Sequence, residues 1–400
     1  MTDDLDQIPW STIYHAYGKG LDTPQHLRNL SHPDPKVIAE AHQALVDTTL
    51  YIQWVSPAAL AAFPYLLSKL FKAKGYSRTY ISDLVMQIIE RLAPAHPSRI
   101  PWFYFVYDNW TFRDQYGADT KRAMPYALVI EEFPNLLRLL HDPDEQFAQM
   151  ILRIVACCVA SDGGLWAEVL PFALAEKRPL LRASYQFVAW ASADPAALAW
   201  VAENVAQTRE PLVKLAAVFI MTQTVQQLPE SMYAWLIATI SVNNLSLIET
   251  YNALKLTHSY WFDCALMLYR RPLSERIPLA EQCLAYLQGQ DAALNDYDVA
   301  ALLMLALGTL RYKKSTIERA AIHSKVVLWI GQQLFTTTKH DREAIERVLR
   351  TFRLPWLRSD RCGRCGCRNR TSSAHFSAAM ATSRCQWLFR PAQCRACWVC

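Results

Sequence analysis

Glycine is scarce in this sequence, at 11 of 400 residues, and no glycine-rich phosphate-binding motif occurs in it. Neither G-x-x-x-x-G-K-S/T nor G-x-G-x-x-G is present, and Gly18-Lys19-Gly20 is interpreted as a short turn. So little glycine disfavours tight hairpins and therefore an all-β sandwich. The motifs H-E-x-x-H and G-x-S-x-G are also missing, which removes the usual sequence evidence for a zinc protease or a serine hydrolase.

Long apolar runs are missing as well. The longest charge-free stretch, Ser231–Ile248, contains Asn243 and Asn244, and we interpret it as a buried helix and not as a membrane span. The first residues hold Asp3, Asp4 and Asp6 without a basic residue, whereas a secretory signal begins with positive charge. We therefore expect a cytoplasmic protein without membrane contact.

The excess of positive over negative charge lies at one end of the chain. The stretch from Arg358 onward holds eight arginines, no lysine and one acid, Asp360, so it contributes +7 to a net charge of +5. The other 357 residues are therefore close to neutral, at −2. A neutral body offers no electrostatic basis for wrapping nucleic acid, and we do not expect that partner.

The same end is rich in cysteine. Seven of the eleven cysteines follow Arg361, and Cys362-x-x-Cys365 and Cys394-x-x-Cys397 have the pair spacing of zinc ligands. The long separation of the two pairs and the abrupt change of composition favour a disordered or non-native extension over residues 358–400 instead. We predict no metal and no cofactor. The remaining cysteines, such as Cys157 and Cys158, lie in apolar stretches and are expected to behave as small hydrophobic residues.

Helical periodicity dominates the rest of the chain. In Thr79–Leu92, apolar residues recur at the i, i+3, i+4, i+7 spacing of an amphipathic helix, and residues 147–158 and 212–220 follow the same pattern. No sustained apolar–polar alternation supports a strand. The sequence therefore predicts an all-α fold.

Five dipeptides predict where helices begin. In each, a side chain that can cap a helix precedes a proline, which suits the first helical position because its missing N–H would be unpaired there. These dipeptides are Thr23-Pro24, Asp34-Pro35, Ser56-Pro57, Asp142-Pro143 and Asp194-Pro195.

A weak internal repeat connects the helices. Phe63-Pro64-Tyr65-Leu66-Leu67 returns 70 positions later as Phe133-Pro134-Asn135-Leu136-Leu137, and Ile100-Pro101 and Leu170-Pro171 continue the series. A second echo links His32-Pro33-Asp34 with Asp142-Pro143-Asp144. Prolines spaced 37, 33 and 37 residues apart indicate one helix–turn–helix unit per step. We predict a HEAT-like α-solenoid over residues 1–357, a curved right-handed stack of antiparallel helix pairs, clearest over 21–225 and degenerate after 270.

The opening elements resemble a known family. Residues 10–18 (WSTIYHAYG), Thr23-Pro24, Leu27-Arg28-Asn29-Leu30 and Pro33-Asp34-Pro35 are similar to the start of bacterial HEAT-repeat proteins of unassigned function. The resemblance covers residues 8–75 and beyond them only the repeat character. The stretch 51–54 departs from the more polar pattern of those relatives. The family implies a HEAT-like fold and a binding scaffold, but no activity.

A dense aromatic run is the first candidate site. Aromatic residues and arginine are favoured anchors of protein interfaces, and a partner-binding surface would use Trp102, Tyr104, Tyr107, Trp110 and Arg113. The alternative is a thick core helix with its loop, because stacked helices also need large side chains between layers.

The second candidate comprises Tyr14, His15 and Tyr17, ahead of the first helix. His15 could act as an acid or base, but no partnered carboxylate or nucleophile is evident nearby, which favours a structural histidine.

A non-enzymatic scaffold that binds another protein is the function these features favour. The alternative is an enzyme on the same scaffold. A HEAT-like glycosylase that acts on alkylated DNA bases would have only Trp102, Trp110 and Asp108 as a plausible site. A chromophore-lyase-type HEAT protein is neither supported nor excluded by the sequence.

Overall fold

The computed structural model describes residues 5–50, 55–92, 120–224, 228–242, 244–289 and 295–308, with residues 325, 326, 329, 330, 333, 345, 348 and 349. Within these residues the chain forms sixteen α-helices, a few 3₁₀ turns and two short strands. The all-α prediction is therefore confirmed for this part of the chain. Contacts divide the chain into unit 1 (Met1–Leu228 with Ser246–Thr257) and unit 2 (Pro229–Leu245 with His258–Cys400).

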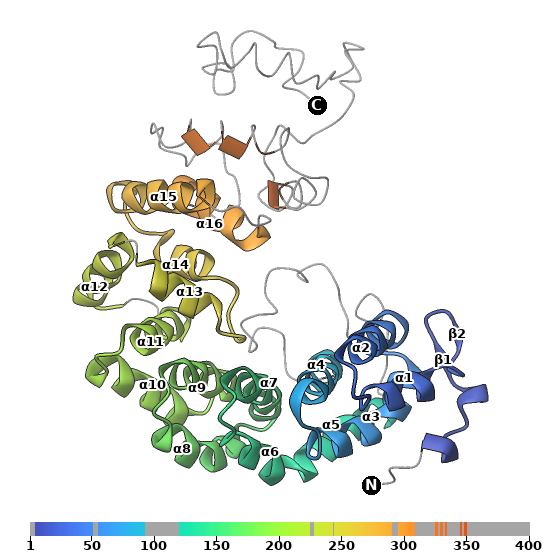
Figure 1. Cartoon of the computed structure of the whole chain (residues 1–400). Helices are drawn as coiled ribbons and strands as arrows, with labels where there is room; N and C mark the ends of the chain where they lie inside the picture. The colour runs from blue at the N-terminus through green and yellow to red at the C-terminus, as the bar shows by residue number, and fades with distance from the viewer. Residues whose placement is uncertain are drawn as a thin grey trace, which may run out of the picture. The chain divides into compact units, whose positions relative to one another are not determined.

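Unit 1 contains two rows of helices (Figure 1). In the central row each helix packs on the next, and the row consists of α2 (Pro35–Thr49), α4 (Gly75–Leu92), α7 (Glu145–Ser161), α9 (Pro179–Ser192) and α11 (Pro211–Thr224). The flanking row consists of α1 (Thr23–Asn29), α3 (Pro57–Leu70), α5 (Thr120–Glu131), α6 (Phe133–Leu139), α8 (Trp166–Ala175) and α10 (Pro195–Gln207). Each flanking helix contacts a neighbour in the central row.

The N-terminal end of unit 1 is formed by short elements. They are η1 (Leu5–Gln7), η2 (Trp10–Thr12), β1 (Tyr14–His15) and β2 (Gly18–Lys19), with one further 3₁₀ turn, η6 (Gly163–Leu165), ahead of α8. The interpretation of Gly18-Lys19-Gly20 as a simple turn was incomplete, because Gly18 and Lys19 pair with β1 as an antiparallel hairpin.

The central row provides the core of unit 1. In α7 every residue from Phe147 to Ala160 is buried except Arg153, which is partly exposed. The predicted stripe of Thr79–Leu92 is buried in α4 except for Leu92, which is partly exposed. Burying a single Val, Leu, Ile or Phe side chain stabilises a fold by about 1.5–3 kcal/mol, so the packing of α7 against α4 and α9 contributes strongly to the stability of this unit.

Three of the five predicted caps are confirmed. Asp34, Ser56 and Asp194 each accept a hydrogen bond from a backbone N–H in the first turn of α2, α3 and α10. The other two predicted caps lie one and two residues away from the cap positions in the structure. Thr23 is the first residue of α1, whose cap position is Asp22, and the cap of α7 is Asp144 in place of Asp142.

The turn before α2 and the turn before α7 share one hydrogen-bonding pattern. The caps Asp34 and Asp144 accept from Lys36 N (2.9 Å) and Gln146 N (3.0 Å) respectively. Two residues before each cap, a side chain accepts from the N–H of the cap itself: His32 Nδ1 at 3.1 Å and Asp142 Oδ1 at 2.9 Å. The sequence similarity between residues 32–34 and 142–144 therefore corresponds to one turn that occurs twice in the structure.

Each of these turns is also hydrogen-bonded to the start of the next helix in the central row. The carbonyl of Leu30 accepts a hydrogen bond from Ser77 Oγ at the start of α4. The equivalent carbonyl, that of Leu140, accepts from Arg178 Nη2 just before α9, at 3.1 Å. A buried carbonyl at a helix end needs such a partner, because it has none within its own helix.

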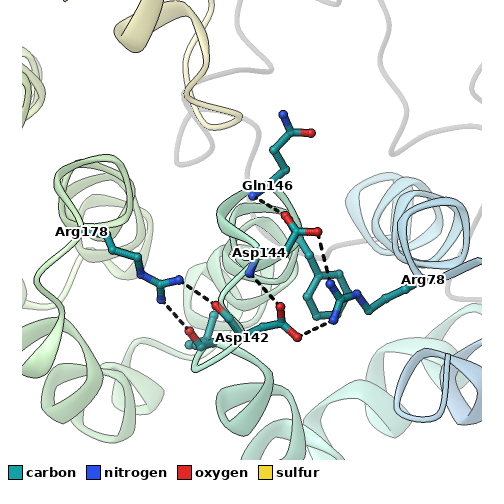
Figure 2. A network of polar contacts seen from close by, with 7 residues as sticks. Arg78, Asp142, Asp144, Gln146 and Arg178 are labelled. Atoms are coloured by element: carbon teal, nitrogen blue, oxygen red, sulfur yellow. Dashed lines mark hydrogen bonds and ion pairs between the residues drawn. The ribbon is translucent and has the colours of Figure 1, made fainter. Parts of the chain in front are cut away.

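Figure 2 shows the more extensive of these two ties, in which Arg78 and Arg178 approach one turn from opposite sides. Arg78 of α4 pairs with Asp142 and with Asp144 (3.2 Å), and its guanidinium lies 4.1 Å from the ring centroid of Phe147. Arg178 donates to the carbonyl of Asp142 at 2.7 Å. Three successive members of the central row, α4, α7 and α9, are thus linked through the turn before α7.

The spacing of the repeat needs a correction. Because α4 packs directly on α7, the 70 residues between Phe63-Pro64 and Phe133-Pro134 correspond to one step of the central row and not to two. The described residues place no helix between α4 and α7. The intermediate step expected at Ile100-Pro101 lies outside the described residues.

Unit 2 is built around three helices that pack on one another: α16 (Asp296–Leu307) contacts both α14 (Tyr260–Leu268) and α15 (Leu273–Gln288), and α15 contacts α12 (Glu230–Ser241). Arg271 joins α12 to α15, because its guanidinium pairs with both Glu230 and Glu275. Those two carboxylates raise the pKa of Arg271. Nearly all of α16 is buried, from Asp298 to Ala306.

The prediction of one buried helix over Ser231–Ile248 was wrong. The stretch forms α12 and then α13 (Leu245–Asn252), and in α12 only Leu236 and Ile240 are buried. Among the described residues, no single helix is long and apolar enough to cross a bilayer, although α12 and α13, as one bent pair, pass that test by length and composition alone.

The cysteines of the described residues fit the expectation of buried apolar packing. Cys157, Cys158, Cys264 and Cys283 are free thiols within buried helices. Burial raises the pKa of each thiol, so all four are protonated and unreactive in the folded protein. The cysteine-rich residues 358–400 lie outside the described part of the chain.

The Arg78 network yields a stability prediction. Arg78→Ala removes a charge from two carboxylates and leaves Asp142, whose side chain is only 18% exposed, without its cation. We expect a loss of roughly 1–3 kcal/mol in the free energy of unfolding, because a partly buried charge loses its hydrogen-bonded partner. Urea unfolding followed by circular dichroism measures this loss.

The matched control is Lys36→Ala, which removes an exposed pair with Glu40 at 3.9 Å. Exposed pairs contribute about 0–1 kcal/mol, so the control should unfold close to wild type. Equal losses in the two variants would contradict a stabilising role for the Arg78 network.

Candidate functional site

The N-terminal hairpin brings together three of the residues that the sequence singled out. Tyr14 pairs with Lys19 and His15 pairs with Gly18 across the two strands. Gly18 has φ 139°, a value that side-chain-bearing residues rarely adopt, which explains why glycine occupies this position. The hairpin packs against α3, and Ala16 N donates to the carbonyl of Thr48 in α2 at 2.9 Å.

His15 is the buried residue of the hairpin. Its Nε2 lies 2.9 Å from Asp22 Oδ1, and its Nδ1 accepts from the backbone N–H of Tyr17 at 3.1 Å. Because Nδ1 accepts, we infer that Nε2 carries the proton and donates it to Asp22. Both ring nitrogens are therefore engaged in holding the hairpin. The expectation that His15 has no partnered carboxylate was wrong, since Asp22 lies seven residues further along the chain.

Asp22 faces a second histidine. Its Oδ2 lies 3.9 Å from Nε2 of His26, one turn into α1. The carboxylate is about half exposed, so this contact with His26 is a weak one. Among the described residues, no three His, Cys, Asp or Glu side chains are arranged to hold a metal ion, and this trio is no exception. Asp22 is thus a positioning residue for His15.

Apolar side chains lie on the outside of the hairpin. Tyr14 is 53% exposed, Tyr17 is 68% exposed and Leu21 is 64% exposed. We call these three residues the hairpin surface. Their backbone is restrained by His15 and Thr48, so they are presented on a fixed framework and do not extend from a free chain end.

The aromatic run could not be tested in the same way. Trp102, Tyr104, Tyr107, Trp110 and Arg113, and also Asp108, lie outside the described residues. The hairpin site contains two residues that the sequence analysis did not select. Leu21 is apolar but precedes a predicted helix start, and Asp22 was overlooked because the cap was assigned to Thr23.

No family model matches this sequence, and no curated protein matches it significantly.

Removal of Asp22 tests how the hairpin is held. Asp22→Ala deprives His15 Nε2 of its acceptor, so we expect the imidazole to move and the backbone N–H groups of Ala16 and Tyr17 to exchange faster with deuterium. Hydrogen exchange measured by mass spectrometry on a peptide covering the hairpin detects the change. Gln25→Ala, which removes an exposed side-chain contact with Asn29 in α1, is the control and should leave exchange in the hairpin unchanged. Unaltered exchange in the Asp22 variant would show that His15 does not depend on it.

Proposed function

We propose that this chain is a non-enzymatic, cytoplasmic scaffold that binds another protein, built as a HEAT-like α-solenoid, with the hairpin surface as one of its contact sites. The observation that carries the proposal is the exposure of Tyr14, Tyr17 and Leu21 on a restrained hairpin.

Support for a solenoid comes from the packing order in unit 1. Successive helices of the central row contact each other, and each is accompanied by flanking helices. Such an array buries apolar surface through contacts between neighbouring units and provides an extended surface for a partner. The repeated turns at Asp34 and Asp144 support the same view, because equivalent residues make equivalent hydrogen bonds.

The end of such an array usually needs a polar outer face, since no further unit covers it. Here the N-terminal hairpin presents two tyrosines and a leucine beside exposed polar residues such as Lys19 and Asp22. Tyrosine is enriched at the energetic centres of protein interfaces, because it contributes a large apolar area together with a polar tip and has few rotamers to lose. The composition of this end therefore favours contact with another protein over plain solvation.

The contacts of His15 support a positioning role for this residue within the hairpin. Its two ring nitrogens are already occupied by Asp22 and by the N–H of Tyr17. A general base needs a free nitrogen within hydrogen-bonding reach of its substrate. His15 instead sets the positions of Tyr14 and Tyr17.

The test is a comparison of partners captured from the native host. Tyr14→Ala combined with Tyr17→Ala should reduce the recovery of specific partners at least tenfold, since interface tyrosines each contribute on the order of 1–2 kcal/mol and tenfold corresponds to about 1.4 kcal/mol. Affinity purification with quantitative mass spectrometry provides the measurement, and circular dichroism confirms that the variant is folded.

The matched control is Tyr76→Ala. Tyr76 is 66% exposed near the start of α4, so the substitution removes an equally accessible tyrosine from a different element. Partners should persist with this control. Equal recovery from all three proteins would remove the hairpin surface as the contact site, and turnover of a small molecule by the pure protein would overturn the non-enzymatic assignment.

A further inference from the structure

Unit 2 contains a buried group of titratable side chains where the N-terminal ends of α14 and α16 meet. Asp263 lies in the first turn of α14 and Asp298 in the first turn of α16, and these two helices pack together. Both carboxyl groups are buried, and His258 just before α14 is buried beside them. Two carboxyl groups and one imidazole thus share an interior site.

The contacts within this group are incomplete. His258 Nδ1 lies 3.3 Å from Asp263 Oδ1, and its ring packs on Phe262 and Tyr297 with centroid distances of 5.0 and 4.8 Å. Among the described residues, no hydrogen-bond partner is found for His258 Nε2 or for Asp298 Oδ1, although both atoms are buried. A buried carboxylate oxygen without a partner strongly disfavours the charged form.

The surroundings of Asp298 supply little compensating charge. From α14 it faces Asp263 and the hydroxyl of Ser259, and from α15 it faces the buried thiol of Cys283. Arg276 of α15 is directed elsewhere, to the carbonyl of Leu305 near the opposite end of α16. Desolvation and the negative charge of Asp263 raise the pKa of Asp298 from 3.8 to about 6, against the opposing effect of the Ser259 hydroxyl.

We propose that the contact between α14 and α16 is a pH-sensitive latch, which holds while the Asp298 carboxyl is protonated and loosens when that carboxyl loses its proton as the pH rises toward neutral. A second negative charge then enters a buried site that already holds Asp263. Local opening exposes that charge to water, so α14 and α16 separate more often at neutral than at acidic pH.

The direction follows from linkage. An acid whose pKa is higher in the folded than in the unfolded chain stabilises the fold fully below its unfolded value, and this contribution is lost as the pH rises through the folded value. The loss for Asp298 therefore runs from about pH 4 to pH 6 and above. With these two values, opening should become about tenfold more frequent between pH 5 and pH 7.5, relative to a variant that cannot ionise.

Asp298→Asn provides that variant. Hydrogen exchange of the full chain, followed by mass spectrometry on peptides covering α14 and α16 and corrected for the intrinsic pH dependence of exchange, measures opening at both pH values. The ratio of wild-type to variant opening should rise about tenfold from pH 5 to pH 7.5. A ratio that stays constant overturns the proposal.

Two further variants serve as a control and as a second, independent test. Asp296→Asn removes a less buried carboxylate from the same first turn of α16, and it should keep the wild-type pH dependence. Ser259→Ala removes the hydroxyl that stabilises the charged form of Asp298 and also the cap of α14. It should shift the midpoint of the transition to higher pH, whereas loss of the cap alone weakens the fold equally at every pH. If Asp298→Asn fails to fold, an unshifted midpoint in Ser259→Ala overturns the proposal.

Discussion

Shared burial along the central row is the constraint on which unit 1 depends. The helix α7 is apolar on nearly all sides, so it has no face that water would solvate well, and it is stable only between α4 and α9. The helices α4 and α9 likewise pack between two members of the row, whereas α2 and α11 each contact one. Stability is therefore distributed along the row, and every turn that spaces two helices correctly contributes to the burial of both.

Polar groups in unit 1 connect the turns of one helix to the start of the next helix in the central row. Helix ends leave carbonyl groups without partners in their own helix, and the carbonyls of Leu30 and Leu140 accept hydrogen bonds from Ser77 and Arg178. Arg178 performs this role from the approach to α9, and Arg78 of α4 pairs with the two carboxylates of the same turn. The same residues that complete a local turn thus determine how far apart two helices lie. This double role explains why charged residues recur at these positions in an otherwise apolar stack.

The two sites considered above use histidine–aspartate contacts in different surroundings. At the hairpin, Asp22 is half exposed and its charge is solvated, so the pair with His15 works as a fixed support for the tyrosines. At the junction of α14 and α16 both carboxyl groups are buried, and Asp298 Oδ1 has no hydrogen-bond partner among the described residues. The same residue types therefore give a rigid support in one place and a titratable contact in the other, because water is available in only one of them.

Local chemistry was sufficient to predict the helical class and three of the helix starts in the described residues. Periodicity at 3.6 residues and the capping side chains of Asp34, Ser56 and Asp194 depend only on neighbours along the chain, and these predictions are confirmed. Three features depended on tertiary structure. The starts of α4 and α7 are 70 residues apart in the sequence, yet the two helices pack directly on each other. His15 contacts Asp22 because the hairpin reverses the chain ahead of α1. Asp263 and Asp298 lie close together because α14 and α16, which α15 separates in the sequence, pack against each other. In each case the deciding contact joins residues that no local pattern relates, so only the folded chain could reveal it.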